Sequence, residues 1–484
     1  MGYLSAVRIA AKAQLRRQLV VGRHLYSTSS APRPSPSQSG TRVVWGVGTV
    51  IAAGGGVYWL SSKLAGDTRL QVPIVKAVTS EENISVMSPV KALDLDSANA
   101  KLREQAQSFV FDSADGKRGR LDVVRVASND PVEDEWSMGV GGGIQGEKTL
   151  YAGIMDGHAG WATSKVLKEA LIPYVSTWLG KVSSTSSEDV VNAAIKRAFT
   201  SLDDRIMANA RKAAEASHEP GSAEAIAALA PAFAGSCALL TIYEPKSSVL
   251  RTAVTGDSRA VLGSWSAATE IFTAEALSKD QTGFNEEEVK RLNAEHPGES
   301  NDILDAKTGR LMGIAVTRGF GDHRWKWTNE FIKYLQSNFY GSAPRPKSKT
   351  PPYMTASPET TVRRVESSDF VILASDGLWD VMSNEDAVIC VSRWLAARRK
   401  GRPEEVDNIK LTGHTLDDEG FLSYKATPEY FAIEDLDNAA VCLVKNALGG
   451  RRRGLFCGAM TVTTPMSRYM RDDITVQVIF FEDP

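Results

Sequence analysis

Cysteine is scarce in this sequence, and none of its four cysteines stands in a C-x-x-C pair. Cys237, Cys390, Cys442 and Cys457 lie far apart, so neither a zinc site nor a disulfide framework is indicated, and reduced, buried thiols are expected. A surplus of either charge is also lacking, because 56 lysines and arginines stand against 58 aspartates and glutamates. The resulting net charge of −2 gives no reason to expect nucleic acid as a partner.

Acidic residues are missing from residues 1–66, while basic residues such as Arg8, Lys12 and Arg16 recur through an Ala/Leu/Val background. This pattern is typical of a mitochondrial presequence, which we predict for residues 1–26. A secretory signal would need a continuous apolar run near the N-terminus, and the basic residues interrupt it. The Ser/Pro-rich residues 27–42 that follow are predicted to form a linker.

Charge of both signs is missing from the 18 residues 43–60, which carry Trp45, Tyr58 and Trp59 near their edges. A helix of this length spans roughly 27 Å, enough to cross a bilayer that thins locally. We therefore predict a transmembrane helix. A glycine-rich linker or a cleaved sorting signal is the alternative, and Arg42 and Lys63 flank the two ends too equally to set an orientation.

Internal repeats are also lacking, and we predict a linker over residues 61–99 and one catalytic domain over residues 100–484. Three low-complexity or Pro/Ser/Lys-rich stretches inside this domain are predicted to be surface loops, namely residues 183–187, 213–231 and 342–352. The charged, irregular residues 398–437 are predicted to be a further insertion.

Short acidic motifs are present at five places in this domain. They are N-D-P-V-E-D from Asn129, D-G-H-A-G from Asp156, G-D-S-R from Gly256, D-G-L-W-D from Asp376 and D-D-I-T from Asp472. Four of them follow or open an apolar run of strand type, so their carboxylates are expected at strand ends, where a sheet brings distant segments together. A lone Asp-Gly is usually a plain turn, but five such motifs together indicate one metal site.

Oxygen donors gathered without zinc-type ligand pairs suit Mg²⁺ or Mn²⁺. Two such ions about 3.5 to 4 Å apart hold a bridging water that becomes a hydroxide nucleophile, which fits phosphate ester hydrolysis. The backbone at Gly157 is small enough for its carbonyl to approach an ion. The alkoxide of a phosphoserine leaves poorly, so His158 is the expected proton donor, with capping of the following helix as its alternative role.

These five motifs, in this order, closely resemble those of the metal-dependent protein phosphatase 2C family over residues 100–481. Longer stretches resemble the mitochondrial pyruvate dehydrogenase phosphatase branch, and its fungal members in particular. They are L-M-G from Leu311, R-G-F-G-D from Arg318, W-K-W from Trp325, P-P-Y-M-T-A from Pro351, N-A-L-G-G from Asn446 and S-R-Y-M-R-D-D from Ser467. The resemblance implies an α+β fold, in which two antiparallel sheets form a central β-sandwich flanked by helices in four layers, αββα.

The resemblance also implies a role for each site residue. The two Mg²⁺ or Mn²⁺ ions would be held by Asp134, Asp156, the carbonyl of Gly157, Asp376 and Asp472. Asp257 would help Asp376 to hold a third, weaker ion, although G-D-S-R equally suits a hairpin turn. Glu133 would orient metal-bound water.

One departure from the family concerns the substrate phosphate. Many members have an arginine four residues before the glutamate of the E-D pair, and this chain has Asn129 there. Asparagine donates hydrogen bonds but brings no charge, so phosphate binding would rest more on the metals or on another cation. Arg125 and Arg318 are the candidates for that cation.

The function expected from the resemblance is a mitochondrial protein serine/threonine phosphatase. Its expected substrate is the phosphorylated pyruvate dehydrogenase E1 subunit, with the lipoyl-bearing E2 core as a further partner. It would be anchored to the inner mitochondrial membrane, with the domain in the matrix. A catalytically inactive binding scaffold and a hydrolase of another phosphate ester are the alternatives.

Overall fold

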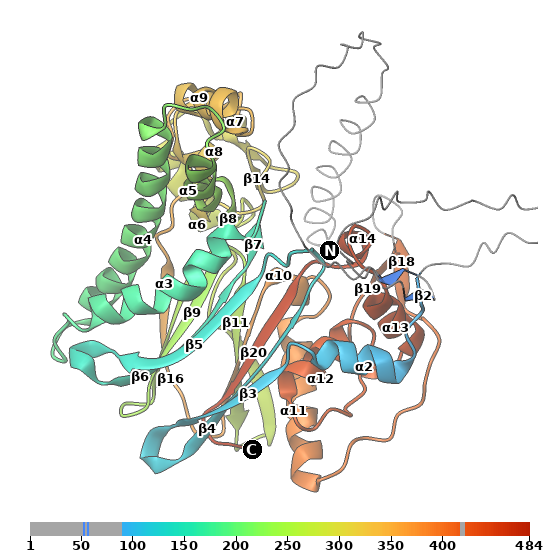
Figure 1. Ribbon diagram of the computed structural model, residues 1–484. Coiled ribbons are helices and arrows are strands. Elements are labelled where there is room, and N and C mark those ends of the chain that lie inside the picture. The colour runs from blue at the N-terminus through green and yellow to red at the C-terminus, as the bar shows by residue number, and fades with distance from the viewer. Residues whose placement is uncertain (1–51, 54–55, 58–89, 417–421) are drawn as a thin grey trace, which may run out of the picture. The chain divides into compact units, whose positions relative to one another are not determined.

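Two antiparallel sheets form the centre of the computed structural model, which describes residues 52–53, 56–57, 90–416 and 422–484 (Figure 1). The five-stranded sheet has the order β16-β10-β9-β6-β5, with the bounds Glu359–Arg364, Val249–Thr255, Ala238–Glu244, Lys148–Met155 and Glu135–Gly142. The six-stranded sheet has the order β12-β11-β17-β20-β4-β3, with the bounds Ile271–Ala276, Arg259–Ser266, Phe370–Ala374, Ile474–Phe480, Arg118–Val126 and Gln107–Asp112.

The central strands are apolar on both faces, and β17 shows why. Val371 and Leu373 point into the core between the two sheets, whereas Phe370, Ile372 and Ala374 point into the core beneath the helices. Successive side chains of a strand alternate between its faces, so a strand covered on both sides is a continuous apolar run. All five of these side chains are fully buried.

Helices cover the outer face of each sheet (Figure 1). On the five-stranded sheet lie α3 (Ala162–Leu179) and α4 (Glu188–Ala216), and Leu167 and Leu171 of α3 share a core with Leu240 and Ile242 of β9. The six-stranded sheet is covered by α2 (Leu95–Arg103), α11 (Asn384–Lys400), α12 (Ala439–Ala447) and α13 (Arg453–Thr461). The predicted four-layer αββα sandwich is confirmed.

The remaining elements are short or lie beyond the sandwich. The helices among them are α5 (Ala223–Phe233), α6 (Glu286–Glu295), α7 (Ser300–Ile303), α8 (His323–Lys326), α9 (Asn329–Phe339), α10 (Asp376–Trp379), α14 (Ser467–Met470), η2 (Ala114–Gly116), η3 (Ile144–Gly146) and η4 (Pro428–Tyr430). The strands are β7 (Gly157–His158), β8 (Gly235–Ser236), β13 (Leu304–Asp305), β14 (Arg310–Leu311), β15 (Phe320–Gly321), β18 (His414–Leu416) and β19 (Leu422–Tyr424). Residues 183–187 and 342–352 contain no helix or strand, as predicted.

The prediction of a surface loop over residues 213–231 is wrong. This stretch contains the end of α4 and most of α5, and Leu229 of α5 is buried against Ile332 and Leu335 of α9. The prediction gave too little weight to alanine, which is the best helix former. The short apolar stripe of Ala225, Leu229 and Ala232 is enough for α5 to pack against its neighbours.

The predicted transmembrane segment lies largely outside the described residues. Its four described residues pair as strands β1 (Ala52–Ala53) and β2 (Gly56–Val57), so the predicted helix is wrong at these positions. Glycine, which forms three consecutive residues here, disfavours a helix. None of the helices within the described ranges is both long and apolar enough to cross a bilayer. The predicted presequence (1–26) and linker (27–42) fall outside these ranges, as do residues 61–89 of the linker predicted over 61–99. That linker prediction is wrong at its end, because α2 begins at Leu95 and Ala98 lies in the core.

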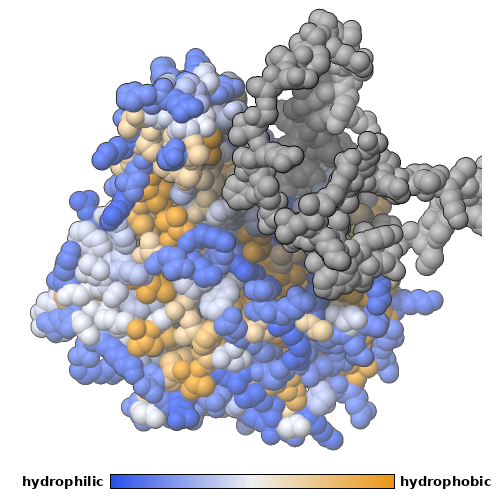
Figure 2. All heavy atoms as spheres, in the orientation of Figure 1, coloured by the Kyte–Doolittle hydropathy of each residue, from blue (hydrophilic) through white to orange (hydrophobic). Residues whose placement is uncertain are grey.

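The surface of the described part is mixed in character. Figure 2 shows hydrophobic side chains in scattered patches among hydrophilic ones on the face that it presents. Val110 and Val140 are among the exposed apolar residues, and single residues of this type are ordinary on a protein surface.

Candidate metal centre

Strand pairing brings four of the predicted metal ligands to one edge of the sandwich. Asp134 directly precedes β5 and Asp156 directly follows β6, and these strands pair Glu135 with Met155 at that edge. In the other sheet, Asp376 follows β17 and Asp472 precedes β20, and these strands also pair as neighbours. The carboxylates therefore meet where the two sheets end, as the motif positions predicted.

Burial and mutual repulsion give these carboxylates unusual proton affinities. Burial and the nearby Asp473 raise the pKa of Asp134 well above its ordinary value. Burial likewise raises the pKa of Asp156, to which the charge of Asp134 adds, and the pKa of Asp376, to which the charge of Asp156 adds. Groups that hold protons this strongly lack compensating positive charge.

The donor set fits divalent cations with a preference for oxygen. Asp134 Oδ2 is buried and has no hydrogen-bond partner among the described residues. A buried, unpaired carboxylate oxygen is costly, and a bound cation removes that cost. Carboxylate oxygens are the ligands of Mg²⁺ and Mn²⁺, so Asp134, Asp156, Asp376 and Asp472 have the chemistry that the predicted ions need.

Asp473, which the sequence analysis did not single out, holds the loop that carries Asp134. Its carboxylate accepts hydrogen bonds from the backbone N–H groups of Ser128, Asn129 and Glu133, at 2.5, 3.1 and 2.8 Å. It also accepts one from the N–H of Asp134 at 3.3 Å. The second aspartate of D-D-I-T thus fixes the N-D-P-V-E-D loop over the last strand.

Residue 157 must be glycine, because its backbone lies very close to the loop that carries Glu133 and Asp134. A Cβ atom at Gly157 would lie 2.3 Å from the carbonyl oxygen of Glu133 and 2.9 Å from Ser164 Oγ. Any side chain would therefore push the loops of Asp134 and Asp156 apart. Coordination of an ion by the Gly157 carbonyl stays a prediction.

Glu133 is clamped by two hydrogen bonds. Asn129 Nδ2 donates to its Oε2 at 2.6 Å, and the N–H of Gly160 donates to its Oε1 at 2.7 Å. Burial raises the pKa of Glu133. The contact assigns Asn129 a role in orienting Glu133, which composition alone did not indicate.

His158 is paired with Asp322, a residue that the sequence analysis did not assign. His158 Nε2 and Asp322 Oδ2 are 2.7 Å apart, and the imidazole is 28% exposed. Burial alone would lower the pKa of His158, but the Asp322 carboxylate holds it above its ordinary value. A partly exposed imidazole whose pKa the Asp322 carboxylate raises suits a proton donor and not merely a helix cap.

A small sheet of three two-residue strands, β15-β8-β7, creates this pair. Gly235 of β8 lies opposite His158 of β7 on one side and opposite Gly321 of β15 on the other. A Cβ at Gly235 would lie 2.1 Å from His158 Nε2 and 2.3 Å from Asp322 Oδ2. The absent side chain at Gly235 leaves the space in which the two side chains meet.

Asp257 lies beside Asp156 and Cys237. One ligand atom from each of the three residues lies within 4.8 Å of the others, and Cys237 Sγ donates to Asp257 Oδ1 at 3.3 Å. Burial and Asp280 raise the pKa of Asp257 to about 6. The alternative role of G-D-S-R as a hairpin turn is wrong, because β10 and β11 belong to different sheets.

The four cysteines are free, as predicted. Cys237, Cys390 and Cys442 are buried, whereas Cys457 is partly exposed. Cys237 was expected to be an ordinary core thiol, but its neighbour Asp257 places it at the edge of the carboxylate centre.

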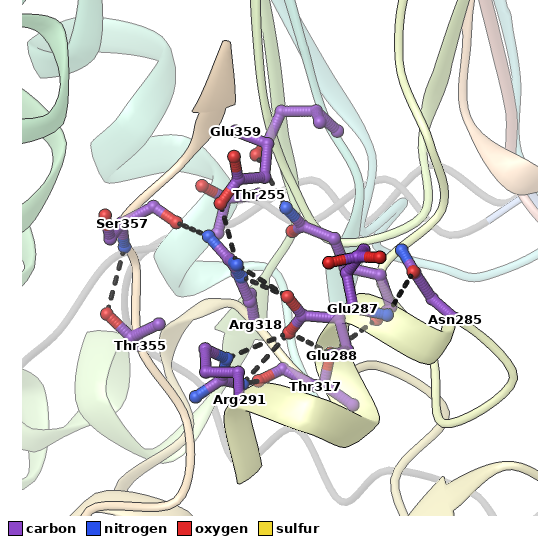
Figure 3. A network of polar contacts seen from close by, with 12 residues as sticks. Thr255, Asn285, Glu287, Glu288, Arg291, Thr317, Arg318, Thr355, Ser357 and Glu359 are labelled. Carbon is purple, nitrogen blue, oxygen red and sulfur yellow. Dashed lines mark hydrogen bonds and ion pairs between the residues drawn. The ribbon is translucent and has the colours of Figure 1, made fainter. Parts of the chain in front are cut away.

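The two arginines proposed as phosphate ligands are both committed elsewhere. Arg318 is buried and uses all three nitrogens: Nε bonds Glu288 at 2.9 Å, Nη1 the carbonyl of Ser357 at 2.8 Å, and Nη2 lies 2.8 Å from Glu359 (Figure 3). Arg125 Nη1 donates to the carbonyl of Asp134 at 2.8 Å and pairs with Glu135. Both arginines therefore support the fold around the centre.

A different arginine, Arg468 of α14, lies at the carboxylates. Its Nη1 donates to Asp472 Oδ1 at 2.6 Å and to Ser128 Oγ at 3.3 Å. The i to i+4 spacing of Arg468 and Asp472 was visible in the sequence, but it resembles any surface ion pair.

Comparison with known proteins agrees with this geometry. The profile of the protein phosphatase 2C family matches residues 132–411. A protein phosphatase 2C homolog of Schizosaccharomyces pombe is 40% identical over 382 residues, covering 75% of this chain and 80% of that protein. The mitochondrial pyruvate dehydrogenase (acetyl-transferring) phosphatase 1 of Saccharomyces cerevisiae is 32% identical over 476 residues, covering 88% and 80%. Its Homo sapiens counterpart is 29% identical over 462 residues, covering 79% and 82%. The chain therefore belongs to the protein phosphatase 2C family.

Proposed function

We propose that this protein phosphatase removes phosphate from serine or threonine of the pyruvate dehydrogenase E1 subunit in mitochondria. The observation that carries the chemistry is the meeting of Asp134, Asp156, Asp376 and Asp472 at one edge of the sandwich, beside a His158 whose partner Asp322 raises its pKa. The substrate is supported by the relatives that are mitochondrial pyruvate dehydrogenase phosphatases. The location is supported by the acid-free, basic residues 1–26.

The proposed metal site holds two Mg²⁺ or Mn²⁺ ions through these four aspartates and the Gly157 carbonyl, and a weaker third ion through Asp257 with Asp376. When bound, such ions neutralise charge on a phosphoryl group and lower the pKa of water. The protein holds the ligands in place beforehand, because Asp473 ties down the Asp134 loop and Gly157 allows the Asp156 loop to approach it.

We assign the proton transfers of the reaction to His158 and Glu133. The alkoxide of serine needs a proton as it leaves, and the His158 imidazolium supplies it from a position fixed by Asp322. Glu133, held by Asn129 and the Gly160 N–H, presents a fixed acceptor for water at the centre. Glu133 would thus serve the attacking water, and His158 would serve the leaving group.

The test is a comparison of substrates for the purified protein in Mg²⁺ and in Mn²⁺. Phosphorylated E1 should be dephosphorylated faster than unrelated phosphopeptides or small-metabolite phosphates, and addition of the lipoyl-bearing E2 core should raise the rate on E1. A preference for a small metabolite would instead support a hydrolase of another ester. Absence of turnover on every phosphate ester would support an inactive scaffold.

The proposed location has its own test. Protease treatment of intact mitochondria and of mitoplasts should leave the domain protected in both, as expected for the matrix. Carbonate extraction tests attachment to the inner membrane, because anchored protein stays in the pellet. Digestion of the domain in mitoplasts would contradict E1 as the substrate.

A further inference from the structure

The predicted binding site for the substrate phosphate has no positive charge at residue 129, where many family members have an arginine. Asn129 is neutral, and its amide nitrogen is already bonded to Glu133 Oε2 at 2.6 Å. Arg125 and Arg318 are committed to Glu135 and to Glu288. The neighbouring Arg471 is buried and donates to the carbonyls of Ala459 and Ala127, at 2.6 and 2.8 Å.

Arg468 brings a guanidinium group to the same place from another part of the chain. Its Nη1 lies 3.3 Å from Ser128 Oγ, and Ser128 immediately precedes Asn129. The same nitrogen donates to Asp472 Oδ1 at 2.6 Å. The group therefore lies between residue 128 and a predicted metal ligand, at the edge of the carboxylate centre.

One edge of this guanidinium group remains available. Both hydrogen bonds of Arg468 use Nη1, and within the described ranges Nε and Nη2 have no protein partner. The side chain is 22% exposed, so solvent reaches it. Adjacent Nε–H and Nη2–H donors form the fork that binds two oxygens of a phosphate at once.

The short helix α14 holds Arg468 in position. Ser467 Oγ and Thr464 Oγ1 both donate to the carbonyl of Ser128, the latter at 3.1 Å. The segment before Asp472 is thereby fastened to the loop that carries Asn129 and Glu133. Because the arginine is fixed in advance, less side-chain entropy is lost when a phosphate binds.

We propose that Arg468 binds the substrate phosphoryl group and supplies the charge that Asn129 lacks. This inference rests on the proposed phosphatase function and adds a substrate-binding residue to its site. Two oxygens of the phosphoryl group accept hydrogen bonds from Nε and Nη2, while Nη1 keeps its contact with Asp472.

The first experiment measures binding of inorganic phosphate to the full chain at saturating Mg²⁺ by titration calorimetry. Arg468→Gln should raise the dissociation constant of phosphate about tenfold or more, the loss expected for a hydrogen bond to a charged group. Arg468→Lys should recover part of the affinity, because it keeps the charge without the fork. Arg363→Gln, at an exposed ion pair with Glu275, is the matched control and should bind phosphate as the wild type does.

The second experiment restores the charge at residue 129. In the Arg468→Gln background, Asn129→Arg should lower the dissociation constant of phosphate again. A purely structural role of Arg468 would not be rescued in this way, since an arginine introduced at position 129 cannot replace the contact of Arg468 with Asp472. Mg²⁺ affinity is measured for each variant, so that weaker metal binding is recognised as such.

Two results would overturn the inference. One is unchanged phosphate affinity in Arg468→Gln at saturating Mg²⁺, and the other is a loss that Asn129→Arg leaves uncorrected. Both differ from a failure of the proposed function, in which the wild-type protein itself would hydrolyse no aryl phosphate or phosphoprotein.

Discussion

Several buried carboxylates destabilise the folded protein as long as no cation is bound to them. Asp134 is buried, and one of its oxygens has no hydrogen-bond partner in the described part of the chain. Burial also raises the pKa of Asp156 and Asp376 well above the ordinary value. Removing one of these charges should therefore affect stability and catalysis in opposite directions. This opposition separates a metal ligand from a structural carboxylate.

Asp156→Asn and Asp376→Asn should each abolish nearly all phosphatase activity, because an amide is a weak ligand for a hard cation. The metal-free variants should unfold at the same temperature as the metal-free wild type or higher, since a repulsive buried charge is gone. Turnover and thermal unfolding in EDTA measure the two effects. More than about a tenth of wild-type turnover at saturating Mn²⁺, a barrier change of only ~1.4 kcal/mol, would exclude that residue as a ligand.

His158→Ala should reduce turnover on a phosphoserine protein by roughly 10²-fold or more, and much less on an aryl phosphate whose phenolate leaves unprotonated. Asp322→Asn should show a smaller loss with the same dependence on the leaving group, because it weakens only the partner of the imidazole. Steady-state rates on both substrates provide the readout. Equal losses on the two would indicate that His158 positions metals or loops instead.

Site residues differed in how far the sequence revealed them. Asp156, Asp376 and Asp472 stand in short motifs next to apolar runs, because the strands beside them are locally encoded. Asp134 ends a loop, and the resemblance to the family supplied the ligand role predicted for all four. Asp322 was not assigned, because its role depends on His158, 164 positions away. Asp473 and Arg468 were equally hidden, since an acid beside an acid and an i to i+4 ion pair have many ordinary explanations.

Among the elements, the short strands β7, β8 and β15 position two residues of the candidate site, although each has only two residues. They are too short for any periodicity in the sequence to reveal them. Their pairing nevertheless sets His158 next to Asp322, with Gly235 between them. A single methyl group at Gly235 should therefore disturb the pair.

Gly235→Ala should lower activity on phosphoserine substrates strongly while costing little stability. The new Cβ would meet the ends of two side chains, His158 Nε2 and Asp322 Oδ2, which can turn away without moving the backbone. Gly139→Ala in β5 is the control, because its Cβ would meet nothing within 4 Å. Circular dichroism, thermal unfolding and turnover distinguish the outcomes, and an active Gly235→Ala would show that the close pair is dispensable.

Elements with strong local signals were predicted well, and those defined by distant partners were not. The strands at Val371 and Ile474 read as apolar runs because both faces are buried. The stretch around Leu229 was mistaken for a loop, because only packing on α9 makes its weak stripe significant. The turn at Asp257 was open to two interpretations, because adjacent strands in the sequence do not reveal that they belong to different sheets.

For the whole molecule, the raised carboxylate pKa values predict that metal binding strengthens with pH. Protons held by Asp257, whose pKa is about 6, and by Asp156 stabilise the metal-free fold below about pH 4, the ordinary carboxylate range, and this contribution is lost as pH rises through the raised values. Metal ions must displace the same protons. The rise in unfolding temperature caused by Mg²⁺ should therefore grow between about pH 5 and pH 8, and a rise independent of pH would contradict the shared site.

The position of β20 in the six-stranded sheet affects how the protein folds during its synthesis. β20 lies between β17 and β4 in space, yet it follows both in sequence, and it is preceded directly by Asp472 and Asp473. A nascent chain that has emerged only as far as α13 would lack β20, the Asp473 carboxylate that holds the Asp134 loop, and the predicted ligand Asp472. The sheet can close only after residue 480 has been synthesised, so we expect the phosphatase to be inactive until then.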